Sequence, residues 1–110
     1  MDLTFLKSQF AYIPEPTKSF AGQTVVVTGS NTGLGREAAR HFVRLNAAKV
    51  ILAVRSIKKG EDARTDIEQT TGKKGVVEVW QLDMANYDSV KAFAKRCESL
   101  DRLDVVMENA

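Results

Sequence analysis

A glycine-rich stretch from Thr28 to Gly35, with the letters T-G-S-N-T-G-L-G, has the spacing best suited to binding chemistry in this sequence. The glycine at the end of an apolar run lets the chain turn sharply, the second lets the backbone approach a bound group, and the third lets a following helix pack closely. Free N–H groups at a helix start, together with the helix dipole, favour an anion such as a pyrophosphate. The stretch therefore predicts a dinucleotide-binding loop, and the alternative is a glycine-rich turn without a ligand. It lacks the G-K-[ST] of a nucleoside triphosphate P-loop.

Arg55 is the second candidate, because it comes directly after the apolar run from Val50 to Val54. In a dinucleotide fold, an acidic residue at this place binds the ribose 2′-hydroxyl and selects NAD, whereas an arginine pairs with a 2′-phosphate and selects NADP. No Asp or Glu occurs from Lys49 to Gly60, and Lys58 and Lys59 add positive charge. The pattern predicts a preference for NADP(H). The alternative is that these basic side chains are ordinary solvated surface residues.

Composition bounds the fold and the partners. The chain has 110 residues, 44% of them hydrophobic and 27% charged, which is typical of one small globular domain. The net charge of +2 gives no broad electrostatic reason to expect nucleic acid or a membrane surface. The single cysteine excludes an internal disulfide framework and a multi-cysteine zinc site, and it favours a cytoplasmic setting. No apolar run approaches the roughly 20 residues that span a bilayer.

The order of the predicted elements indicates how these residues are positioned. Apolar, β-branched runs predict four strands, at Thr24–Thr28, Val50–Val54, Val76–Trp80 and Leu103–Met107. Amphipathic stretches predict three helices, from Leu34 to about Leu45, from a cap at Ser56 to about Thr70, and across Val90–Leu100, with Asn46 and Gly72 as left-handed stops. A β-α-β-α-β-α-β order predicts an α/β fold with a parallel sheet and right-handed crossovers, the first portion of a doubly wound Rossmann fold.

The apolar faces of the helices give a candidate core. The first helix carries a stripe of Leu34, Ala38, Phe42 and Leu45, flanked by Ala39 and Val43. The second has a thin apolar face of Ile57, Ala63 and Ile67, which predicts a surface helix. Cys97 continues the stripe of the third helix and is expected to be buried, as is Trp80 at a strand end.

Two regions divide the chain. Within residues 1–20, Pro14 and Pro16 prevent a helix through residues 13–16, and the helical spacing of Leu3, Leu6 and Phe10 allows a short amphipathic turn before them. This lead-in is expected to pack as an arm over the domain edge. A membrane or partner contact is the alternative for this arm. Residues 21–110 are expected to form an incomplete dinucleotide-binding domain.

Together, four segments resemble the N-terminal half of the short-chain dehydrogenase/reductase family. These are the glycine stretch, the basic residue after the second strand, Leu82-Asp83-Met84 after the third strand and Asn109-Ala110 after the fourth. The run from Ala53 to Glu61 is similar to retinol-dehydrogenase-like and fungal NADP-dependent members. The resemblance covers about residues 22 to 110. It implies NADP(H) as cofactor and hydride transfer to or from a carbonyl or alcohol carbon of a small-molecule substrate.

The resemblance also implies which residues bind the cofactor. They are Gly29, Asn31, Thr32, Gly33, Leu34, Gly35, Arg55, Asp83, Met84 and Asn109. The loop would hold the pyrophosphate with the Leu34 backbone in direct contact, and Arg55 would hold the 2′-phosphate. The Asp83 side chain would contact the adenine amino group, with the Met84 backbone beside it. Asn109 would lie near the nicotinamide-side ribose, although Glu108 stands where the family usually has a further Asn.

The family's catalytic Ser, Tyr and Lys have no counterpart in these residues, so the chain is expected to be inactive alone. Tyr87 and Lys91 spell Y-x-x-x-K, but they precede the predicted place of that pair and are expected to be surface residues at a helix start. A non-catalytic nucleotide-binding module, or a truncated inactive relic, is the alternative function. No metal site is expected, and the sequence leaves substrate and oligomeric state open.

Overall fold

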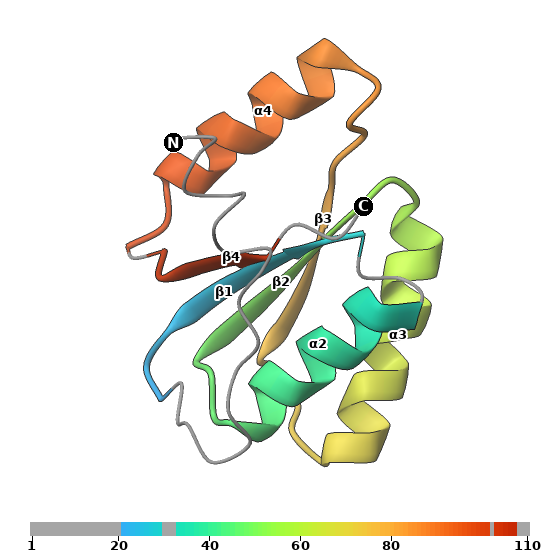
Figure 1. Ribbon diagram of the computed structural model, residues 1–110, viewed down its shortest axis with the longest axis vertical. Helices are drawn as coiled ribbons and strands as arrows, with labels where there is room; N and C mark the ends of the chain where they lie inside the picture. Colours follow the sequence, from blue (N-terminus) through green and yellow to red (C-terminus); the bar gives the residue numbers. More distant parts are fainter. Residues whose placement is uncertain (1–20, 30–32, 102, 108–110) are drawn as a thin grey trace.

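The computed structural model describes residues 21–29, 33–101 and 103–107, and within them four strands alternate with three helices (Figure 1). The strands are β1 (Thr24–Thr28), β2 (Lys49–Val54), β3 (Val77–Gln81) and β4 (Val105–Met107), and the helices are α2 (Gly33–Arg44), α3 (Ile57–Thr71) and α4 (Tyr87–Glu98). The predicted order of elements is confirmed. The arm expected over residues 1–20 lies outside the described residues.

The strands form one parallel sheet with the order β3-β2-β1-β4. The chain passes from β1 to β2 to β3 in one direction and then returns to place β4 on the other side of β1. In the register, Val26 of β1 lies between Ile51 of β2 and Val106 of β4. This is the doubly wound Rossmann arrangement, and the reversal of strand order puts its switch point between β1 and β4.

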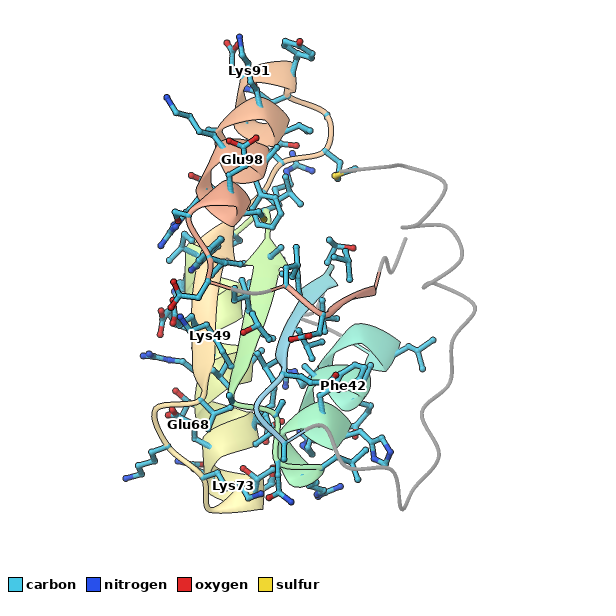
Figure 2. The ribbon with its side chains drawn as sticks, turned by 90° about the vertical axis from the view of Figure 1, so that its left-hand side faces the viewer. Phe42, Lys49, Glu68, Lys73, Lys91 and Glu98 are labelled. Atoms are coloured by element: carbon cyan, nitrogen blue, oxygen red, sulfur yellow. The ribbon has the colours of Figure 1, made fainter. Side chains whose placement is uncertain are left out.

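Alternate residues of each strand supply two separate cores, because successive strand side chains point to opposite faces. One core joins the sheet to α2 and α3 and includes Val25, Leu52, Phe42 and Ile67. The other lies on the α4 side and includes Val26, Ile51, Trp80, Cys97 and Val106. Figure 1 shows α2 and α3 together on one side of the sheet and α4 on the other, and Figure 2 shows Phe42 of α2 well apart from Lys91 and Glu98 of α4.

The ends of α2 and α3 follow the signals read from the sequence. Asn46, just beyond α2, has a φ of 72°. The Ser56 side chain accepts a hydrogen bond from the Lys59 N–H and caps the start of α3. Gly72 ends α3 in the left-handed conformation, and its N–H donates to the Glu68 carbonyl. These three expectations are confirmed.

Leu34 and Ile57 were predicted to lie on buried helix faces, and the structure exposes both. Leu34 is 75% exposed, and the buried face of α2 consists of Gly35, Ala39, Phe42 and Val43. Ile57 is 42% exposed, so the buried face of α3 begins at Gly60 rather than at Ile57. Each of the two misplaced residues stands in the first turn of its helix, where the helix extends past the end of the strand that precedes it. Periodicity alone does not show where the sheet stops covering a helix.

Aromatic contacts attach α4 to the sheet. Trp80 of β3 is buried and meets the Phe93 ring edge-on, with 5.8 Å between the ring centroids. The Arg96 guanidinium lies over the Trp80 ring at 4.1 Å from its centroid, a cation–π arrangement. Cys97 is buried beside them as expected, and burial raises the pKa of its thiol.

Candidate functional site

Backbone hydrogen bonds tie the carboxyl ends of three strands together. The Gly29 N–H donates to the Ala53 carbonyl at 3.0 Å, and the Leu82 N–H donates to the Val54 carbonyl at 2.7 Å. Pairing between neighbouring strands therefore continues to the last residues before the loops. The glycine stretch, Arg55 and Asp83, which are far apart in sequence, consequently emerge at the same edge of the sheet.

The glycine stretch leaves β1 beside the switch point, where doubly wound sheets bind their ligands. Gly29 has a φ of 63° and Gly33 a φ of 52°, conformations that residues with a Cβ rarely adopt. A Cβ on Gly33 would meet nothing within 4 Å, so its conformation rather than its space calls for glycine. Gly35 is buried on the face of α2 that packs against the sheet. The predicted contributors Asn31 and Thr32 lie outside the described residues.

A hollow of about 720 Å³ opens at the ends of β2 and β3. It is lined by Arg55, Ser56, Ile57, Lys59 and Gln81. Two of these side chains are cationic, one carries a hydroxyl and one carries an amide, and none is acidic. The set of donors therefore fits an anionic group.

The first turn of α3 is electrostatically unusual. It contains no acidic residue, and Arg55, Lys58 and Lys59 gather at this end. The positive end of a helix dipole repels cations by about 0.3–1 kcal/mol each at exposed positions. A bound anion would convert this repulsion into attraction, so the residues present fit a phosphate group.

Asp83 and Met84 follow β3 at the same edge. One carboxylate oxygen of Asp83 accepts a hydrogen bond from the Ala85 N–H at 3.0 Å, and the Asp83 N–H donates to the Ser89 hydroxyl at 2.9 Å. Asn86 rather than Asp83 caps α4, and the bond from Ala85 places the Asp83 carboxylate in a local turn. Met84 is exposed beside it. Asn109 and Glu108 lie outside the described residues.

Tyr87 and Lys91 do not join this group of residues. Tyr87 is the first residue of α4 and is 78% exposed, and Lys91 is exposed on the same helix. In the described part of the chain, no three His, Cys, Asp or Glu side chains gather as a metal site would require. None of the helices described there has the length and apolar character needed to cross a bilayer.

Gln81 is a lining residue that sequence reasoning missed. It is the last residue of β3 and pairs in register with Val54, the residue before Arg55. The sequence does carry a signal for it: along one face of the strand, valine at residues 77 and 79 gives way to glutamine at residue 81. The signal becomes meaningful only when the register of β3 against β2 is known.

Comparison with known proteins identifies the family. The sequence profile of the family described as short chain dehydrogenase matches residues 23–110. The chain belongs to the short-chain dehydrogenase family. The short chain dehydrogenase atnD of Emericella nidulans is 58% identical over 106 residues, which is 96% of this chain and 34% of that protein. The chain thus spans about a third of the length of the curated relatives it matches.

Solved structures agree with this fold. A menthone neomenthol reductase from Mentha piperita is 33% identical, with a TM-score of 0.73 over 81% of this chain and 31% of that chain. The C-domain of a bacterial malonyl-CoA reductase, solved with NADP, is 26% identical, with a TM-score of 0.69 over 86% of this chain and 15% of that chain. As an oxidoreductase family that binds nicotinamide cofactors and acts on small molecules, the short-chain dehydrogenases account for the Rossmann arrangement seen here.

Proposed function

We propose that this chain is the NADP(H)-binding part of a short-chain dehydrogenase/reductase. The observation that carries the proposal is the hollow at the ends of β2 and β3, where Arg55 and Lys59 line a space and no carboxylate occurs among the described lining residues. A 2′-phosphate needs cationic partners at this place, whereas a 2′-hydroxyl is served by an acidic one. The malonyl-CoA reductase domain solved with NADP supports the same assignment.

The remaining residues at the edge take complementary parts in this assignment. The glycine stretch with its Asn31 and Thr32 binds the pyrophosphate, and the Leu34 backbone contacts it at the start of α2. Asp83 receives the adenine amino group with Met84 beside it, and Asn109 contributes near the nicotinamide-side ribose. The chemistry that a bound nicotinamide supplies is hydride exchange with a carbonyl or alcohol carbon of a small molecule. We assign the catalytic Ser, Tyr and Lys of the family to residues outside these 110. We also propose that the protein works in the cytoplasm.

Paired affinities for NADPH and NADH, measured by titration calorimetry, test the proposal. We expect tighter binding of NADPH. Arg55→Ala removes charge-assisted hydrogen bonds worth about 1.5–3 kcal/mol, which corresponds to a loss of about 10- to 150-fold for NADPH and little change for NADH. Arg44→Ala is the matched control, because Arg44 is an exposed arginine at the far end of α2.

Two results would contradict the proposal. One is tighter binding of NADH than of NADPH by the unsubstituted protein. The other is an NADPH/NADH affinity ratio that neither Arg55→Ala nor Arg44→Ala changes. A third result would favour the non-catalytic alternative. In that case, a protein that also contains the family's catalytic residues binds NADPH but turns over no carbonyl substrate.

A further inference from the structure

We infer that Gln81 is a specificity-determining residue of the nucleotide site, whose side-chain amide contacts the substituent on the 2′ carbon of the adenosine ribose. The inference rests on the proposed function and adds a residue from a different strand. The hollow draws its other lining residues from the connection that follows β2 and from the first turn of α3. Gln81 alone among them comes from β3, so it adds a residue of the neighbouring strand to the lining.

The register of the sheet determines where the Gln81 side chain points. Gln81 pairs with Val54, and both belong to the row of strand residues that faces α3. Val77 and Val79 precede Gln81 in this row and pack in the core under α3. Because α3 begins only at Ile57, the helix does not cover the last residue of this row, which is Gln81. The Gln81 amide therefore lies at the hollow instead of in the core.

The bonding capacity of this amide is not taken up by the protein. Among the described residues, the side chain of Gln81 takes part in no hydrogen bond or ion pair, and it is exposed. An exposed amide without a protein partner bonds to water, and a ligand group that reproduces those hydrogen bonds can displace the water. The amide is therefore available to a ligand in the hollow.

The chemistry of a primary amide explains what it would recognise. Its N–H groups donate to phosphate oxygens, and its carbonyl accepts from a hydroxyl, without adding charge. Next to Arg55 and Lys59, a neutral amide admits the phosphate and adds a hydrogen bond to it. A carboxylate of the same shape would repel the phosphate and accept from a 2′-hydroxyl, so residue 81 sets how strongly NADP is preferred to NAD.

Substitution of Gln81 in the purified protein, followed by calorimetric titration with NADPH and NADH, tests the inference. We expect Gln81→Glu to lower the NADPH/NADH affinity ratio at least about tenfold, and Gln81→Met, which keeps the length but removes the amide, to lower it about threefold. Gln69→Glu is the matched control, because it adds the same charge to an exposed position near the other end of α3. A purely structural role for Gln81 would change both affinities together and leave their ratio unchanged.

The outcomes separate the inference from the proposed function. If Arg55→Ala lowers the ratio but Gln81→Glu behaves like Gln69→Glu, the inference is wrong and the proposed function stands. If Gln81→Glu lowers the ratio and raises the affinity for NADH, the inference is supported. If the parent protein binds neither dinucleotide, or prefers NADH, the proposed function fails and the inference with it.

Discussion

Gly60 lies where α3 comes closest to the sheet. A Cβ built at this position would stand 2.5 Å from a Val79 methyl and 2.6 Å from a Val54 methyl, both on buried or half-buried strand residues. Neither methyl can swing away as the end of a flexible side chain would, because valine is stiff at χ1 and both residues pack in the core. We therefore expect Gly60→Ala to push the first turn of α3 away from β2 and β3.

The size of the effect follows from two opposing contributions. Overpacking a close-packed core costs about 1–3 kcal/mol, and two contacts this short belong at the upper end of that range. Replacing glycine by alanine in a helix returns about 1 kcal/mol of helix propensity. We expect a net loss of about 1–2 kcal/mol in the free energy of unfolding. Lys59 is adjacent to Gly60 and lines the hollow, so the affinity for NADPH should fall as well.

Urea denaturation followed by the fluorescence of Trp80, the only tryptophan in the sequence, measures the change. Thr65→Ala, at an exposed position of the same helix, is the control, because it raises helix propensity without a new contact. Val79→Ala combined with Gly60→Ala should recover about 1 kcal/mol relative to the sum of the single variants. If Gly60→Ala matches or exceeds the stability of the parent, the close approach of α3 to the sheet is not as described.

Two groups of ion pairs give the remaining predictions. The Asp66 carboxylate of α3 accepts hydrogen bonds from both Arg36 and Arg40 of α2, and the Arg40 side chain is largely buried. Asp66→Asn should therefore lower the free energy of unfolding by about 1–2 kcal/mol, measured by urea denaturation. Burial acts to raise the pKa of Glu78, but hydrogen bonds from Trp80 and Lys49 outweigh it and lower that pKa below its ordinary value of 4.5. A lowered folded-state pKa stabilises the protein above pH 4.5, and this contribution is lost as the pH falls through the folded value. Glu78→Gln should therefore lose a few tenths of a kcal/mol at pH 7 and show a smaller further loss on acidification, measured by melting at several pH values.

Matched substitutions control for the loss of charge. Asp62→Asn changes an exposed carboxylate of α3, and Glu98→Gln changes an exposed carboxylate of α4. Equal stability of Asp66→Asn and Asp62→Asn would show that the two arginines do not hold α2 to α3. A pH dependence that Glu78→Gln shares with Glu98→Gln and the parent would refute the role of Glu78.

Local signals were sufficient to predict most elements. β-branched residues identify β1 and β2, since such side chains favour a buried, pleated strand. Ser56 and Gly72 mark the ends of α3 because a hydroxyl cap and a left-handed glycine act over only a few residues. The predicted burial of Leu34 and Ile57 was wrong, because the exposure of a residue in the first turn of a helix depends on where a neighbouring strand ends.

The sequence by itself determined the glycine stretch, Arg55 and the parallel fold, because spacing along one chain segment and the alternation of element types are local properties. Only the tertiary structure decided that Gln81 shares a hollow with Arg55, and that Gly60 must be a glycine. The physical reason is the register: these relations depend on which residue of β3 lies beside which residue of β2, and on how closely α3 packs over both. Pairing and packing across the sheet join residues that no spacing rule along the chain connects.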